Sequence, residues 1–468
     1  MSFLSLPFVI LISVLLILLF FIKNGKAERL LLLIASYLFY ACFDVHALAL
    51  LFLLSLFTWA GAKLIAGLIK NGQKDSSKKL LIACIFVQVI VLAFFKYAGL
   101  FPMPVGLSFY MLQAISLLAD TYRGDIKIPS GAEVPEDAPV VPSLLDSLVY
   151  IGFFPQVVSG PIVKARDFIP QLSARKKLTL ERFSYGIQLF ALGAFLKLVM
   201  ADRLAVCVDK VYDAPLAYSG LTLLLTSVGY SLQLLFDFAG YSDMAIGVAW
   251  LLGFDLEKNF NLPYMSVNPS DFWHRWHISL SSWLKDYLYI PLGGSRKGNT
   301  RTYINIFLTM VISGLWHGST VNFLIWGALH GLWQVIHRAL THLHPNNKTE
   351  QRTPLLRFRS VISMILSFLA VNFLWIPFRA QTLSDTWTIV SRIVTLKPGI
   401  GYYYVYIFIF GAILLIVQLI TACKGDSGNP VKPLPLGRMY GKIAFCILII
   451  ATLMFAYFGS GAFIYSQF

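Results

Sequence analysis

Long apolar runs constrain this chain more than any other feature of its 468 residues. Stretches such as 3–22 and 46–69 carry almost no charge and have about the length that crosses a bilayer core roughly 30 Å thick as a helix. The composition agrees, because 57% of the residues are hydrophobic and 13% are charged, whereas soluble domains carry about 25% charged residues. The chain is therefore predicted to be an all-α, polytopic membrane protein.

The pattern predicts a single membrane domain over residues 1–468, with about 11–12 transmembrane helices and additional re-entrant or interfacial helices. The region 124–143, which is acidic and rich in proline, is expected to be a loop. The apolar runs are 3–22, 30–43, 46–69, 80–98, 105–119, 183–201, 221–253, 302–316, 320–340, 360–378, 402–422 and 443–458, of which 302–316 and 320–340 are expected to form a hairpin.

The formal net charge of +15 has a topological explanation. Lysine and arginine fall in short loops between the apolar runs, as in 23–29 and 70–79, and do not gather on one soluble face. Cytoplasmic loops carry such an excess of positive charge. We therefore expect no nucleic-acid partner, and both termini on the outer side of the membrane. The first run, 3–22, is expected to be a retained span, because it is long and no basic residue precedes it.

The segment 144–163 is predicted to be broken. Basic loops stand on both of its sides, so a simple crossing does not fit, and it contains Gly152, Pro155, Gly160 and Pro161. Non-helical backbone at membrane depth is tolerated only where protein or a water-filled cavity covers it. The segment is therefore expected to be a re-entrant or broken helix beside a cavity.

An amphipathic helix is predicted over Asp271–Tyr287, following the start signal Asn268-Pro269-Ser270. His277 lies at the border of its aromatic face. An aromatic anchor in the lipid headgroups is an equally good interpretation of the periodicity. The aromatic face has Trp273, Trp276, Leu280, Trp283 and Tyr287, and the polar face has Arg275, Ser279, Ser282 and Asp286.

His317 is expected at membrane depth. The run before it, 302–316, rises only about 22 Å as a helix, which is too short to span the bilayer. An ionisable residue at such a depth is a functional-site hypothesis, and a buried imidazole kept neutral can act as a general base. The alternatives are a structural histidine that bridges two helices and, for the nearby His330, a packing role.

The five cysteines are widely separated and lie mostly inside apolar runs. They show no CxxC pair and no metal-ligand spacing. We expect them to be buried small hydrophobic residues, and we expect no metal.

The stretch from about residue 90 to 340 resembles the membrane-bound O-acyltransferase (MBOAT) family, in the bacterial branch that O-acetylates alginate or peptidoglycan. One departure from the family pattern is His274, where the family more often has arginine. The matching motifs are Gly106-Leu-Ser-Phe-Tyr110, Asp120-Thr-Tyr-Arg123, Phe154-Pro-Gln-Val-Val-Ser-Gly160-Pro161, Gly240-Tyr-Ser-Asp243, Asn259-Phe-Asn-Leu-Pro263-Tyr264, the His277 segment, Tyr289-Ile-Pro291-Leu-Gly293-Gly294, Gly314-Leu-Trp-His317-Gly318 and Trp326-Gly-Ala-Leu-His330-Gly331.

The resemblance implies acyl transfer across the membrane through a central funnel, with His317 as the essential catalytic histidine and His277 as the second site histidine. The implied donor is cytoplasmic acetyl-CoA. The candidates for contacting the donor are Arg275, Trp276, Lys285 and Trp316. On this interpretation 1–100 are N-terminal helices, and the other parts are the catalytic core 101–340, the C-terminal helices 341–458 and a tail 459–468.

The tail is similar to a C-terminal tyrosine motif of bacterial acyl-transfer systems, in which the tyrosine hydroxyl carries the acyl group. Here that residue is Tyr465. A phenol with a pKa near 10 is a weak nucleophile at neutral pH, so a histidine within hydrogen-bond reach is needed to activate it. The alternative is an aromatic anchor at the membrane interface.

The expected function is O-acetylation of a cell-envelope polysaccharide or peptidoglycan from the bacterial cytoplasmic membrane, through an extracytoplasmic hydrolase-like acetyltransferase partner. One alternative is D-alanyl transfer from a carrier protein to teichoic acid. An alternative of another class is a transporter or flippase, because transporters also use broken helices and buried histidines.

Overall fold

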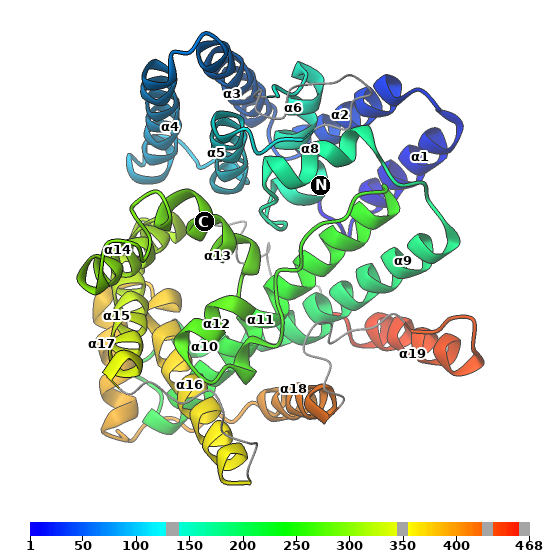
Figure 1. The fold of residues 1–468 in the computed structure, drawn as a ribbon. Coiled ribbons are helices and arrows are strands. Elements are labelled where there is room, and N and C mark those ends of the chain that lie inside the picture. The colour runs from blue at the N-terminus through cyan, green and yellow to red at the C-terminus, as the bar shows by residue number, and fades with distance from the viewer. Residues whose placement is uncertain (128–139, 344–353, 424–433, 458–468) are drawn as a thin grey trace. The chain divides into compact units, whose positions relative to one another are not determined.

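The computed structural model describes residues 1–127, 140–343, 354–423 and 434–457, which form helices joined by turns and loops (Figure 1). Within these ranges no strand forms, apart from an isolated bridge between Tyr218 and Ile400. The predicted all-α class is confirmed. The chain divides into two compact units, which are described separately.

The first unit has residues 1–194 and 241–257 of the described chain. Its hydrophobic centre is aromatic, and Phe8 stands within 6.4 Å of both Phe39 and Phe190, measured between ring centroids. Its helices are α1 Leu6–Phe21, α2 Gly25–Ala41, α3 Val45–Lys70, α4 Lys74–Tyr97, α5 Leu107–Arg123, α6 Leu144–Gly152, α7 Phe154–Val157, α8 Ala165–Ser173, α9 Leu180–Phe195 as far as Ala194, and the last part of α11.

The second unit has residues 195–240 and 258–457 of the described chain and contains both candidate histidines. The helix α11, Gly220–Leu251, is one continuous helix that begins in this unit. The other elements are the π-helix η1 Leu196–Ala201, α10 Asp202–Tyr212, η2 Pro263–Met265, α12 Pro269–Arg275, α13 Ile278–Leu284, the π-helix η3 Lys285–Tyr289, α14 Asn299–His317, α15 Val321–Leu343, α16 Pro354–Arg379, α17 Leu383–Val394, α18 Val405–Cys423 and α19 Met439–Phe455.

Four helices of the described chain are long and apolar enough to cross a membrane: α3, α4, α11 and the part of α16 from Arg359 to Arg379. Three shorter apolar helices lie over Leu6–Phe21, Val405–Val417 and Met439–Phe455. Only 11% of the apolar window of α4 is buried inside the protein. Its outward face is therefore apolar, as a face in contact with lipid must be.

The predicted break in 144–163 is confirmed. The helix α6 stops at Gly152, and after Phe153 a single short helix, α7, leads into a turn and then irregular backbone up to Lys164. Protein groups satisfy polar backbone atoms of this buried segment: the Ser36 hydroxyl accepts the Phe154 N–H at 3.2 Å, and the Tyr150 hydroxyl donates to the Val163 carbonyl at 2.8 Å. A buried non-helical segment thus lies inside the first unit.

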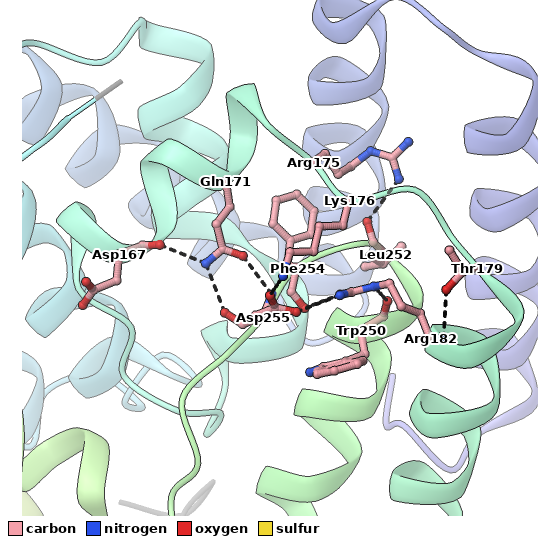
Figure 2. A network of polar contacts seen from close by, with 10 residues as sticks. All are labelled: Asp167, Gln171, Arg175, Lys176, Thr179, Arg182, Trp250, Leu252, Phe254 and Asp255. Carbon is pink, nitrogen blue, oxygen red and sulfur yellow. Dashed lines mark hydrogen bonds and ion pairs between the residues drawn. The ribbon is translucent and has the colours of Figure 1, made fainter. Parts of the chain in front are cut away.

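A polar network ties α8, the start of α9 and the segment after α11 together (Figure 2). The carboxylate of Asp255 accepts hydrogen bonds from Arg182 at 2.9 Å and from Lys176, while Gln171 binds both the N–H and the carbonyl of Asp255. Burial by itself raises the pKa of Asp255, but Lys176 and Arg182 outweigh it and hold that pKa below its usual value. Some of the basic residues that the sequence places in loops thus form ion pairs inside the first unit.

The prediction of one continuous helix over 271–287 is wrong. The chain forms α12, breaks at Trp276 and His277, and continues as α13 and then the π-helix η3. The segment is also not a surface anchor, since Trp276 is 1% exposed and His277 is fully buried. The cause is the backbone of His277, whose φ of +44° is left-handed and ends a right-handed helix.

The structure also contains helices in regions where the sequence analysis predicted a loop or assigned no element. The basic region 164–182 contains α8, and α10 and α17 are short helices outside the predicted spans. Each has an apolar stripe too short to be recognised as a span, and that stripe is buried against neighbouring helices. The predicted loop 124–143 lies partly outside the described residues.

Candidate active site

His317 is placed by a tight helical hairpin. It is the last residue of α14, and Gly318 leads the chain into α15, which packs alongside α14 (Figure 1). A Cβ atom at Gly314 would lie 2.3 Å from the Phe323 carbonyl oxygen, and one at Gly327 would lie 2.4 Å from the Met310 carbonyl oxygen. Because only glycine permits this approach, these glycines set the position of the His317 backbone.

The imidazole of His317 lies among aromatic side chains of the second unit. The side chain is 3% exposed, and its ring centroid lies 4.9 Å from that of Trp316, 5.0 Å from that of Trp326 and 5.4 Å from that of Phe378. The ring of His277 lies 6.5 Å from that of His317 between centroids. The structure therefore brings together the two histidines that were selected from the sequence.

His277 occupies the break between α12 and α13 and is held there by Asn259. The side-chain oxygen of Asn259 accepts the Ser279 N–H at 3.3 Å and the Ser279 hydroxyl at 2.9 Å, and it lies 3.0 Å from Nδ1 of His277. The backbone carbonyl of Asn259 also accepts the Ile278 N–H at 2.9 Å. One asparagine thus stabilises the left-handed turn and orients the imidazole.

These contacts define the tautomer of His277. A backbone N–H can only donate, so the Asn259 atom that faces Ser279 is the amide oxygen, and Nδ1 of His277 must carry the proton that it donates. Burial lowers the pKa of His277 to about 3, which keeps the ring neutral near pH 7. Nε2 is therefore the basic nitrogen of this ring.

The other predicted donor-contact residues occupy different surroundings. Trp316 contacts both histidines, at 4.9 Å from His317 and 6.4 Å from His277 between ring centroids. Trp276 is buried against Phe260 and Trp375 in the aromatic core. Lys285 is exposed at the start of η3.

Arg275 is held locally, because it pairs with Asp271 at 2.7 Å. His274, the departure from the family pattern, is exposed and lies 2.5 Å from the Ser270 carbonyl oxygen through Nδ1. Tyr465, the predicted acyl carrier, lies outside the described residues.

The sequence analysis missed a buried ion cluster in the second unit. The Lys197 amine lies 2.7 Å from the Asp202 carboxylate and 2.5 Å from that of Asp237, and all three side chains are at most 7% exposed. Lys197 and Asp237 stand inside predicted spans, and ionisable residues within membrane spans signal function by default. That signal was available in the sequence.

The residue after Asp237 connects this cluster with the histidines. The Phe238 ring stands edge-on to the His277 ring, with 4.7 Å between centroids and 90° between planes. Within the described ranges, no group of three histidine, cysteine, aspartate or glutamate side chains is placed to hold a metal ion.

Comparison with known proteins gives a family. The model of the MBOAT family, described as the membrane-bound O-acyltransferase family, matches residues 29–376. A probable alginate O-acetylase of Pseudomonas putida is 38% identical over 78% of this chain and 74% of its own length. The peptidoglycan O-acetyltransferase of Helicobacter pylori is 35% identical over 80% of this chain and 75% of its own length. The teichoic acid D-alanyltransferase of Bacillus subtilis is 27% identical over 75% of this chain and 90% of its own length.

Proposed function

The chain belongs to the membrane-bound O-acyltransferase family, and from this premise we propose that it moves an acetyl group from cytoplasmic acetyl-CoA to the outer side of a bacterial cytoplasmic membrane. It is a multi-pass membrane enzyme, an O-acyltransferase of the O-acetylating kind. The acceptor that we propose is a cell-envelope polysaccharide or peptidoglycan, reached through an extracytoplasmic hydrolase-like acetyltransferase partner.

One observation carries the proposal. Two buried imidazoles, His277 and His317, stand 6.5 Å apart between ring centroids, and Asn259 orients the first of them. A general base must reach the proton that it removes through a hydrogen bond or one water. Two rings at this separation can act on one small reacting group, and the aromatic side chains around them keep bulk water away.

The proposed chemistry uses Tyr465 as a covalent carrier. His317 takes the phenolic proton, the phenolate oxygen attacks the thioester carbonyl carbon, the C–S bond breaks, and the protonated imidazole returns the proton to the CoA thiolate. An acceptor hydroxyl then takes the acetyl group and Tyr465 regains its proton. We assign to His277 the orientation of the reacting group.

The donor is proposed to approach from the side that carries the basic loops. Arg296, Lys297 and Arg301 are exposed on the second unit and suit the phosphates of CoA. Arg175 and Arg182 suit them less, because they pair with Glu28 and Asp255 at 2.9 Å. Positive-inside topology accounts for the same charges without a ligand.

D-alanyl transfer is the second candidate. The relative from Bacillus subtilis favours it, at 27% identity. The 35–38% identity to O-acetylating relatives ranks acetyl transfer above it.

The test is turnover by the purified protein in nanodiscs, with mass analysis of the C-terminal peptide. We expect release of CoA and an acetyl group on Tyr465, both reduced about 100-fold or more in His317→Gln, because general acid–base catalysis contributes about 10²–10⁴-fold. His46→Gln is the matched control, since His46 is exposed at the start of α3.

Activity with a D-alanyl carrier protein and none with acetyl-CoA would replace the proposed donor. Turnover with acetyl-CoA that leaves Tyr465 unmodified would remove the carrier. Full activity of His317→Gln would contradict its assignment as the base.

A further inference from the structure

The last described residues of the chain are bound by η1 and the residues after it, within the second unit. The Tyr457 N–H donates to the Leu198 carbonyl at 2.9 Å. The guanidinium of Arg203 donates twice to the carbonyl of Phe455, the last residue of α19, through Nε at 3.0 Å and a terminal nitrogen at 2.8 Å. Three hydrogen bonds thus hold residues 455–457 at one place.

Arg203 is itself held in position. Its other terminal nitrogen lies 3.3 Å from the Tyr406 hydroxyl, and its guanidinium carbon lies 5.2 Å from the centroid of the Tyr406 ring. An aromatic face attracts a guanidinium and limits its rotation. The side chain therefore presents two donors in a fixed direction to the end of α19.

The element that receives the chain end is a π-helix. Its hydrogen bonding includes the Asp202 N–H to the Lys197 carbonyl, five residues back. Single π turns are rare and occur frequently at functional sites. The same turn carries Lys197, which is buried between Asp202 and Asp237, so it cannot shift without moving an ion cluster.

This π turn also leads toward the histidines. Lys197 pairs with Asp237 of α11, and the next residue, Phe238, contacts the His277 ring at 4.7 Å between centroids. One continuous set of contacts therefore runs from Tyr457 through η1 and α11 to His277. All of its members lie within the second unit.

We propose that η1 and Arg203 form an intramolecular docking site for Phe455–Tyr457, and that Arg203 is a positioning residue that sets where the C-terminal tail leaves the protein. The inference rests on the proposed function, in which Tyr465 carries the acetyl group. Tyr465 follows Tyr457 by eight residues. An extended chain covers at most about 3.6 Å per residue, so the docking site confines the Cα atom of Tyr465 to a radius of about 29 Å around Tyr457.

Confinement matters because it sets the effective concentration of the phenol at the histidines. A short tether gives an effective concentration in the millimolar range, which falls steeply as the tether lengthens. If residues 455–457 come away from η1, the tail gains free length and the phenol is diluted. The docking site therefore acts on transfer to the tethered tail and not on the histidines themselves.

The first test compares tethered with untethered acetylation in the full-length chain. Arg203→Gln is expected to slow acetylation of the chain's own Tyr465 by at least about 1.6-fold, because the free tether grows from eight to about eleven residues and the effective concentration falls at least as the −3/2 power of its length. In a Tyr465→Phe background, Arg203→Gln is expected to leave the acetylation of an added peptide of residues 458–468 unchanged, because the added peptide has no tether. Arg203→Lys, which keeps a charge and donors, is expected to recover part of the tethered rate.

Arg392→Gln is the matched control. Arg392 also donates to backbone carbonyls, at 2.9 Å to Tyr218 and 2.7 Å to Pro398, but it holds no part of the tail. We expect its tethered rate to be unchanged. An equal loss of tethered and untethered acetylation in Arg203→Gln would show general damage and overturn the proposal, as would no loss at all.

The second test does not depend on activity. Hydrogen exchange at the Tyr457 amide reports its bond to Leu198 directly, and we expect exchange about tenfold faster in Arg203→Gln and unchanged in Arg392→Gln. Unchanged exchange in Arg203→Gln would overturn the docking site. A wild-type chain that turns over acetyl-CoA without acetyl on Tyr465 would remove the proposed carrier, and the exchange rates would still decide whether η1 binds the chain end.

Discussion

His277 shows at the scale of one residue how a strained backbone serves a site. Its left-handed φ of +44° is uncommon for a residue with a side chain, and such conformations cost of order 1–3 kcal/mol and persist only where the surroundings enforce them. Asn259 does so, through its backbone carbonyl to Ile278 and its side chain to Ser279 and His277. Residues with such strained backbones are found preferentially at active sites, which supports a functional role for His277.

The tautomer of His277 gives the first prediction. Asn259→Ala removes the acceptor of the Nδ1 proton, so the ring can take the other tautomer, and kcat is expected to fall about 10- to 100-fold. Ser279→Ala is the control, because it removes one donor to Asn259 and leaves the contact with His277 in place. Steady-state release of CoA measures both, and equal rates for the two variants would contradict the assignment.

The pKa of His277, lowered by burial to about 3, predicts a pH-dependent stability. In the unfolded chain the imidazole titrates near 6.5, so between about pH 6.5 and pH 3 the unfolded state binds the extra proton. The contribution of His277 is therefore complete above pH 6.5 and is lost as the pH falls.

Thermal unfolding in detergent measures this loss. The unfolding midpoint of the wild type is expected to fall more between pH 7 and pH 5 than that of His277→Gln, which cannot titrate. Parallel pH profiles for the two proteins would contradict the buried neutral ring.

The α14–α15 hairpin is the element on which the position of His317 depends. Gly314→Ala would set a Cβ atom 2.3 Å from the Phe323 carbonyl oxygen, so the two helices must separate. We expect a lower unfolding midpoint together with a loss of CoA release of at least about tenfold, since a displacement of about 1 Å can cost a hundredfold in rate.

Gly67→Ala is the control for helix propensity. Gly67 lies in α3, and a Cβ atom there has no neighbour within 4 Å. Alanine in an exposed helix is favoured over glycine by about 1 kcal/mol, so this variant is expected to be slightly more stable and fully active. A Gly314→Ala protein that behaves like Gly67→Ala would mean that the hairpin tolerates separation.

At the scale of the whole molecule, the charge pattern predicts orientation. Lys70, Lys74, Lys78 and Lys79 surround the turn between α3 and α4, and this charge predicts that the turn lies in the cytoplasm and the N-terminus outside. In a cysteine-free background, Ser2→Cys is expected to react with a membrane-impermeant maleimide in intact cells, and Gln73→Cys only after lysis. The reverse pattern would invert the topology and the proposed side of the donor.

The sequence alone determined the fold class and the family, and it selected the two histidines that we propose for the site. Apolar runs as long as 46–69 have one stable form in a bilayer, because helices satisfy every backbone group internally, and α3 and α4 follow their runs closely. The break in 144–163 was also readable, because glycine and proline act locally. These features depend on composition and nearest neighbours along the chain.

Only the tertiary structure decided how the site is assembled. The periodicity of 271–287 is that of one helix, and it breaks at His277 because Asn259, distant in sequence, binds the turn. The pairing of Lys197 with Asp237 and the binding of Tyr457 by Leu198 likewise join segments far apart in the chain. Local patterns do not encode such contacts. A buried polar group is stable only when packing brings a second group, distant in sequence, close enough to form a hydrogen bond or an ion pair with it.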